Sequence, residues 1–161
     1  TGNMGSTQRM NYTMMGDSVN LAARLEEAAK QYGIYIQISG QTLEQLTHPE
    51  EFITRRIDKI RVVGKSEPVD TYEIISLNLN IDQKVIELVE KFNEGIKNYE
   101  SRQWDDAIKC FEESIELEKY RFSDQVITKT NPSEVYINRC KEFILTPPPE
   151  DWDGVYVLTK K

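Results

Sequence analysis

The sequence of 161 residues lacks several features that would place a protein in a broad class at once. It contains no apolar run of about 18 residues, so no segment is predicted to span a membrane. Its two cysteines are too few for a disulfide-stabilised secreted scaffold. It also has no excess of positive charge, because 20 Lys and Arg stand against 27 Asp and Glu and the net charge is −7. No overall field would attract nucleic acid or an anionic membrane, so we expect neither as a partner.

The composition is that of a folded, water-soluble chain. Hydrophobic residues make up 39% and charged residues 29%, with a mean hydropathy of −0.57, and the length fits one ordinary domain or two small ones. The sequence starts at Thr1 without a signal peptide, so we expect a piece of a longer parent protein whose upstream part could carry a membrane anchor. Cys110 and Cys140 lie far apart on segments that look helical. We expect both to be reduced and packed, in a cytoplasmic protein.

The chain divides by its patterns into an α+β part and an all-α part. Residues 1–77 mix strand and helix signals, whereas residues 82–145 carry helix signals alone, so we predict domains at 1–77 and 82–161. In the first domain Asp17 or Ser18 is predicted to cap a helix, and Gly33 is predicted to end it. The expected elements are strands at 9–15, 34–39, 52–63 and 69–75, helices at 19–31 and 41–46, and a turn at 64–68.

The second domain is predicted to form three helices, at 83–101, 104–117 and 132–145. The first two resemble a tetratricopeptide unit. Small side chains at 95, 107 and 114 would let them approach closely, and such a short array should dock on the α+β part or on a partner. Trp152 and its neighbours suggest that the tail packs back onto the helices. The tetratricopeptide-like positions are Gly95, Tyr99, Trp104, Ala107 and Phe111.

Three residues near the start of the chain form a graded polar row. Thr13 ends a predicted strand, and Asn20 and Arg24, four positions apart, share one face of the helix that follows. The row runs from neutral hydrogen-bonding groups to a permanent positive charge, which is the order of base, ribose and phosphate in a nucleotide. A guanidinium suits the charge that develops at a phosphorus centre. Taken alone, however, an arginine on an amphipathic helix is more often solvated and inert.

Other polar residues carry weaker signals. His48 has no second histidine or cysteine nearby and is interpreted as a turn residue. Gly2 and Gly5 lack the spacing of a phosphate-binding loop. The basic run at 55–61 is interpreted as a solvated strand face rather than a nucleic-acid site. Its members are Arg55, Arg56, Lys59 and Arg61.

A longer string surrounds the polar row. Residues 12–26 follow the pattern YT-x-x-GD-x-VN-x-A-x-R-x-E, and residues 62–74 read VVGKSEPVDTYEI. Over about residues 1–76 the sequence resembles the catalytic domain of class III adenylate and guanylate cyclases, and the helices and tail resemble those of bacterial members. The matching positions are Tyr12, Thr13, Gly16, Asp17, Val19, Asn20, Ala22, Arg24 and Glu26.

The resemblance implies the carboxy-terminal portion of a ferredoxin-like catalytic domain and a lyase reaction in cyclic nucleotide signalling. The 3′-hydroxyl of ATP attacks the α-phosphate, which yields cyclic AMP and pyrophosphate. By position Thr13 matches the purine-selecting residue and favours ATP, Asn20 the ribose-orienting asparagine, and Arg24 the arginine that stabilises the pentavalent phosphate.

The resemblance also implies groups that the pattern leaves incomplete. The family's phosphate-binding lysine precedes a glycine in a late turn. Here Val63 precedes Gly64, and Lys65 is the candidate substitute. Two family aspartates that hold Mg²⁺ or Mn²⁺ belong to a part that would precede Thr1, and Asp17 is interpreted as a cap rather than a ligand.

Each family site is shared across a head-to-tail homodimer, so we expect this chain alone to make no cyclic nucleotide. The alternative is a non-catalytic interaction module, in which the helices recruit a protein partner and the cyclase part is a degenerate remnant. The residues of the polar row favour the enzyme, and Val63 favours the module. A guanylate cyclase is a third possibility, against which Thr13 argues.

Overall fold

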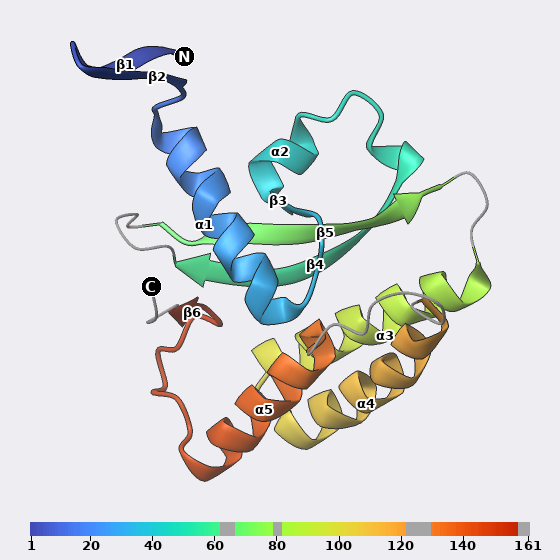
Figure 1. Cartoon of the computed structure of the whole chain (residues 1–161). Helices are drawn as coiled ribbons and strands as arrows, with labels where there is room; N and C mark the ends of the chain where they lie inside the picture. Colours follow the sequence, from blue (N-terminus) through green and yellow to red (C-terminus); the bar gives the residue numbers. More distant parts are fainter. Residues whose placement is uncertain (62–66, 79–81, 122–129, 158–161) are drawn as a thin grey trace.

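The computed structural model describes residues 1–61, 67–78, 82–121 and 130–157 (Figure 1). Within these ranges two sheets and a set of helices make up the fold, which confirms the expected mixture of α and β structure. No helix in these described ranges is long and apolar enough to cross a membrane. The elements are β1 (Gly2–Ser6), β2 (Arg9–Thr13), α1 (Asp17–Tyr32), β3 (Gln37–Ser39), α2 (Gly40–Glu44), a 3₁₀ turn (Pro49–Glu51), β4 (Phe52–Arg61), β5 (Val69–Leu77), α3 (Gln83–Glu100), α4 (Trp104–Arg121), α5 (Pro132–Leu145) and β6 (Tyr156–Val157).

The main sheet has the strand order β3-β5-β4-β6. Strands β3, β5 and β4 are antiparallel, and β6 runs parallel to β4 with Ile60 opposite Tyr156. A register shift between Arg56 and Asp58 bends β4, so that adjacent residues Ile57 and Asp58 are both buried. The predicted strand at 34–39 is shorter than expected, because only 37–39 pair with β5. The predicted turn at 64–68 lies mostly outside the described residues.

Helix α1 crosses the main sheet (Figure 1). Its apolar residues recur at helical spacing, and Leu25, Ala28, Ala29 and Tyr32 are buried with residues of β4. The helix ends at Gly33, which takes the left-handed conformation as predicted. The sheet and α1 therefore share one hydrophobic cluster.

Helices α3 and α4 form a close antiparallel pair against which α5 packs. A Cβ placed on Gly95 would lie 2.6 Å from the Phe111 ring, so the prediction that small residues bring these helices together is confirmed. Buried Ala107 and Ser114 line the same seam, and Ser114 pairs with Ser133 of α5 at 3.0 Å. Both cysteines, Cys110 and Cys140, are buried free thiols, as expected.

The tail returns from α5 to the sheet. Trp152 packs edge-on against Tyr99, and its indole nitrogen donates to the carbonyl of Val155. Arg102 donates to the carbonyls of Pro149 and Glu150. The prediction that the tail packs on the helices is confirmed, and the structure adds the pairing of β6 with β4.

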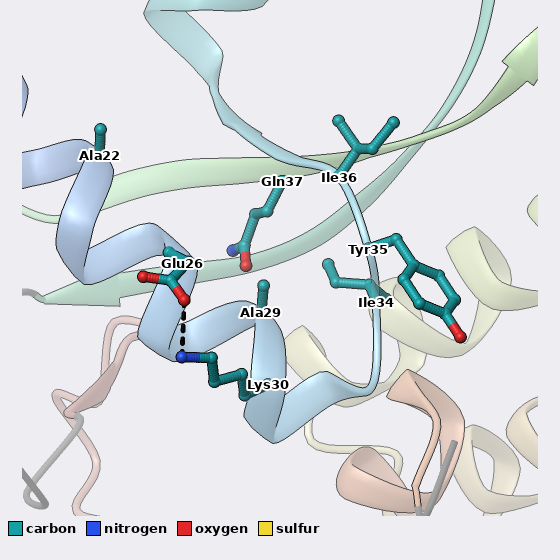
Figure 2. A pocket seen from close by; sticks show the side chains of 8 residues that line it. All are labelled: Ala22, Glu26, Ala29, Lys30, Ile34, Tyr35, Ile36 and Gln37. Atoms are coloured by element: carbon teal, nitrogen blue, oxygen red, sulfur yellow. Dashed lines mark ion pairs between the residues drawn. The ribbon is translucent and has the colours of Figure 1, made fainter. Parts of the chain in front are cut away.

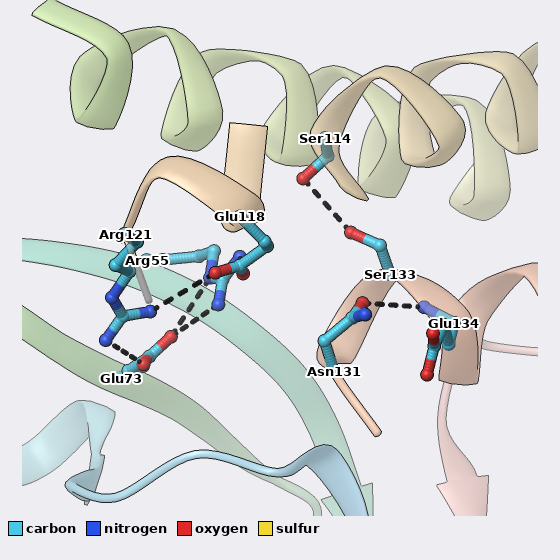
Figure 3. A network of polar contacts seen from close by, with 8 residues as sticks. All are labelled: Arg55, Glu73, Ser114, Glu118, Arg121, Asn131, Ser133 and Glu134. Carbon is cyan, nitrogen blue, oxygen red and sulfur yellow. Dashed lines mark hydrogen bonds and ion pairs between the residues drawn. The ribbon is translucent and has the colours of Figure 1, made fainter. Parts of the chain in front are cut away.

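The interpretation of the basic run as a solvated face is wrong for Arg55, which is fully buried. Residues 55 and 57 are two apart on a strand, so the arginine lies on the same face as buried Ile57. Its guanidinium bonds Glu73 of β5 and Glu118 of α4, at 2.6 and 2.5 Å. Arg121 bonds the other oxygen of Glu73 at 2.6 Å, which completes a neutral group of two arginines and two glutamates (Figure 3).

This buried group joins the sheet to the helices. Arg56 adds a partly exposed link, since it pairs with Asp70 of β5 and with Glu100 of α3 at 3.0 and 2.8 Å. The prediction that the helical segment docks on the α+β part is therefore confirmed. The division into two domains at residues 78–81 stays a prediction.

Candidate functional site

The corner between β2 and α1 presents the predicted polar row. The chain turns at Gly16, whose φ of 147° is in the region that side chains disfavour, so glycine suits this corner. The predicted cap by Asp17 or Ser18 is wrong, because Gly16 is the N-cap and α1 begins at Asp17. An acidic residue in the first turn still interacts favourably with the helix dipole.

Asn20 and Arg24 lie on one face of α1, one turn apart, as the sequence predicts. Asn20 is exposed, whereas Arg24 is partly buried at the border of the face that packs on the sheet. Its nitrogen Nη1 is buried and has no hydrogen-bond partner among the residues that the structure describes. A buried donor without an acceptor costs roughly 1–3 kcal/mol, so Arg24 would be stabilised if this nitrogen met an acceptor.

Thr13 is exposed at the end of β2, four residues before α1 begins. Its strand pairs only with β1, and Thr13 lies opposite Gly2. Lys65, the predicted phosphate contact, and Val63 lie outside the described residues. The structure thus places Asn20 and Arg24 on one helix face, and Thr13 on the hairpin that leads into that helix.

The hairpin and corner expose an unusual amount of apolar surface. Single apolar side chains scattered over a surface are ordinary. Several large apolar side chains close together, in contrast, are typical of a surface that contacts another molecule. The exposed fractions are 58% for Met10, 74% for Tyr12, 59% for Met14 and 72% for Met15.

A pocket of about 360 Å³ lies on a different side of α1. At about 100° per residue, Glu26 points some 160° away from Arg24, so the pocket does not include the polar row. Figure 2 shows Gln37 of β3 directed toward α1, with Glu26 and Lys30 paired at 2.6 Å beside it.

The residues that the structure describes contain no group of three or more His, Cys, Asp or Glu side chains that could hold a metal ion. His48 lies in an exposed turn, with its Nδ1 3.2 Å from Glu50. The described residues by themselves therefore offer no cluster of three or more side chains to a divalent cation.

A buried polar contact at the other end of α1 was not predicted from the sequence. Arg139 of α5 donates to Asp58 of β4 and to the hydroxyl of Tyr32, the last residue of α1, at 2.7 and 2.8 Å. Burial, followed by the Asp58 charge, raises the pKa of Tyr32 above its ordinary value. The sequence did contain a signal for the burial of Arg139. This residue lies three positions after Tyr136 and four before Phe143, on the apolar face of its helix.

Comparison with known proteins supports the resemblance of residues 1–76 to a cyclase catalytic domain. Residues 1–76 match the family model of the adenylate and guanylate cyclase catalytic domain. The chain is 32% identical over 148 residues to "Adenylate cyclase, terminal-differentiation specific" of Dictyostelium discoideum, a match that covers 90% of this chain and 6% of the relative. It is 43% identical over 74 residues to an adenylate cyclase of Anabaena cylindrica, covering 45% of this chain and 15% of the relative.

A third relative, adenylate cyclase 1 of Rhizobium meliloti, is 36% identical over 76 residues, which is 47% of this chain and 11% of the relative. No solved structure matches the chain. The chain spans at most 15% of the length of these curated relatives. Residues 1–76 are therefore related to the catalytic domain of adenylate and guanylate cyclases.

Proposed function

We propose that this chain is the carboxy-terminal part of an adenylate cyclase that converts ATP to cyclic AMP and pyrophosphate. One observation carries the proposal. In a segment related to cyclase catalytic domains, α1 presents Asn20 and Arg24 on one face, and the buried Nη1 of Arg24 lacks a partner in the described chain.

The residues of this chain bind and orient the nucleotide. Thr13 contacts the purine edge and favours adenine, and Asn20 holds the ribose so that its 3′-hydroxyl faces the α-phosphate. Arg24 donates hydrogen bonds to the α-phosphate oxygens, where negative charge grows as the new P–O bond forms and pyrophosphate leaves. Lys65 contacts the phosphate chain.

A divalent cation, Mg²⁺ or Mn²⁺, would supply charge neutralisation at the phosphates. Its ligands are proposed to lie outside this sequence and to reach the nucleotide from the second subunit of a homodimer. The exposed apolar residues Met10, Tyr12, Met14 and Met15 support a contact between subunits at this corner.

The helical segment is proposed to be a tetratricopeptide-like part of the same enzyme. The family model ends at residue 76, but the match to the Dictyostelium discoideum cyclase covers 90% of this chain and so includes much of the helices. The alternative, an interaction module whose cyclase part is a remnant, is favoured by the departure at Val63. The helices would then recruit a protein partner.

The test is turnover of ATP by the longer enzyme with Arg24→Ala. We expect kcat to fall by about 10²-fold or more, because a transition-state donor is lost, with the homodimer intact. Asn20→Ala should also lose turnover. The matched control is Gln31→Ala, an exposed position near Arg24 in angle on α1 but two turns further on.

Arg24→Ala with unchanged turnover would contradict the catalytic role and favour the interaction module. A second measurement concerns this chain alone, incubated with ATP and Mn²⁺. We expect no cyclic AMP above background, and product formation would show that the chain needs no further residues.

A further inference from the structure

Helix α1 is held at its carboxy-terminal end by a contact from outside the cyclase-related segment. Asp58 of β4, Tyr32 of α1 and Arg139 of α5 are 3%, 0% and 5% exposed. Arg139 lies well beyond residue 76, where the match to the cyclase domain ends. The helical segment therefore reaches the helix that carries Asn20 and Arg24.

The three side chains form a closed triangle of hydrogen bonds. Arg139 uses Nη1 for Asp58 and Nη2 for the Tyr32 hydroxyl, at 2.7 and 2.8 Å, and the hydroxyl in turn donates to the same carboxylate oxygen of Asp58. A planar guanidinium presents its donors in a fixed fork, so the two acceptors are held in one relative position.

Asp58 is itself fixed by its strand. Its other carboxylate oxygen accepts the backbone N–H of Lys59 at 2.7 Å, and its carbonyl accepts the Thr71 hydroxyl of β5 at 3.1 Å. The triangle therefore ties Tyr32 to the sheet and to α5 at once, and it does so within the bend of β4.

A helix transmits this constraint along its axis. Arg24 and Asn20 precede Tyr32 by eight and twelve residues, which is about 12 and 18 Å at 1.5 Å per residue. The rotation and axial position of α1 at Tyr32 therefore set the direction in which both side chains project.

We propose that Arg139 is a positioning residue for α1, which it orients through Asp58 and the Tyr32 hydroxyl. The helical segment thereby fixes the face that presents Asn20 and Arg24. The structural coupling is independent of the reaction, whereas its effect on turnover rests on the proposed function.

The first test compares two buried hydroxyls. Tyr32→Phe removes the link to α1 and keeps the Asp58–Arg139 ion pair. Tyr136→Phe is the matched control, because its hydroxyl is also buried but donates to the Ile57 carbonyl on β4 and not to α1. The measured quantity is the ratio of the hydrogen-exchange rate of α1 amides to that of β5 amides in this chain. This ratio should be at least tenfold higher in Tyr32→Phe than in the control.

A third variant breaks the same triangle from the other side. Arg139→Lys keeps the positive charge but loses the fork, so it should speed exchange in α1 in the same way. Equal α1 exchange in Tyr32→Phe and Tyr136→Phe would overturn the proposal. A rise of the same size in α1 and β5 would overturn it too, because it would show general destabilisation.

The second test is kinetic and uses the longer enzyme. Tyr32→Phe should lower kcat at least fivefold with less than a twofold change in the KM for ATP, and Tyr136→Phe should not. Combined with Arg24→Ala, Tyr32→Phe should lower kcat by a smaller factor than it does alone, since part of its effect acts through the Arg24 side chain.

The two failures are distinguishable. If Arg24→Ala leaves turnover intact, the proposed function fails and the exchange experiment alone decides the coupling. If Arg24→Ala abolishes turnover but Tyr32→Phe behaves like Tyr136→Phe in hydrogen exchange or in kcat, the positioning role of Arg139 is overturned while the proposed function stands.

Discussion

A buried arginine is stable only where its charge and its donors are met. Arg55 meets this condition with Glu73 and Glu118, and its guanidinium also stacks over the Phe92 ring at 4.7 Å. Each carboxylate comes from a different element. Removal of the arginine would leave two buried glutamates with Arg121 as their remaining partner in the group.

We expect Arg55→Met to lower the free energy of unfolding by about 3–5 kcal/mol, since one member of a buried ionic group is lost. Urea denaturation measures the change. The control is Arg9→Met on exposed β2, which should stay within about 0.5 kcal/mol. A loss below 1 kcal/mol for Arg55→Met would show that the group contributes little to stability.

Gly95 allows the close contact of α3 with α4. Alanine at this position would place a Cβ 2.6 Å from the Phe111 ring. Overpacking should outweigh the gain in helix propensity and cost about 1–2 kcal/mol in unfolding free energy. Asn93→Ala, exposed on the same helix, should be neutral or slightly stabilising. Equal stability of both variants would argue against tight packing here.

Buried proton donors predict alkaline instability. Burial raises the pKa of the Cys140 thiol to about 12, and burial also raises the pKa of the Tyr32 and Tyr136 hydroxyls. Above pH 9 the unfolded chain loses these protons first, so stability should fall as pH rises. Each group can contribute up to about 1.4 kcal/mol per pH unit. Equal unfolding free energies at pH 8 and 10.5, at constant ionic strength, would contradict this.

At the scale of elements, the tail connects the helices to the sheet by contacting both. Trp152 lies 5.3 Å from the rings of Tyr99 and Phe143, and the chain after it pairs with β4. Aromatic contact and strand pairing therefore hold the same short segment.

Trp152→Ala should lower the free energy of unfolding by about 2–3 kcal/mol. This loss is somewhat smaller than that expected for truncation of a fully buried tryptophan, because the Trp152 side chain is only half-buried. Thermal or urea unfolding measures this. Leu145→Ala is the control, since that side chain is 85% exposed and should change stability by less than about 0.5 kcal/mol. Similar effects of the two substitutions would mean that the tail packs loosely.

The elements that sequence predicts well are those with a strong local period. Helix α1 and the pair α3 and α4 follow from apolar residues at helical spacing, and α5 follows from Pro132 at its start. Non-local pairing could not be predicted. The shortness of β3 and the addition of β6 depend on where β5 and β4 lie, which no local pattern encodes.

In the candidate site, too, local features could be predicted from the sequence and non-local contacts could not. Asn20 and Arg24 follow from a spacing of four on one helix, so their common face was predictable. The partial burial of Arg24 and the hydrogen bond from Arg139 to Tyr32 depend on packing between distant segments, so neither could be predicted. Arg55 was misjudged because its charge suggested exposure, although its register with Ile57 placed it inside.

At the scale of the whole molecule, the buried contacts make the two halves interdependent. The ionic group joins β4 and β5 to α4, and the Asp58–Arg139 pair joins β4 to α5. Loss of the helices would remove Glu118 and Arg121 from the ionic group and Arg139 from Asp58, so the halves should unfold together.

We therefore expect a single cooperative transition in urea. Fluorescence of Trp104 and Trp152 reports the helices and tail, and hydrogen exchange of β4 and β5 reports the sheet. The two midpoints should coincide. Loss of the fluorescence signal while the strands stay protected would show two independent domains.

The most direct test of the central claim is a structure of the longer enzyme with a non-hydrolysable ATP analogue. We predict that the guanidinium of Arg24 lies within hydrogen-bond distance of the phosphates and that the amide of Asn20 lies within hydrogen-bond distance of the ribose. A nucleotide bound away from α1, with Arg24 packed against its own subunit, would contradict it.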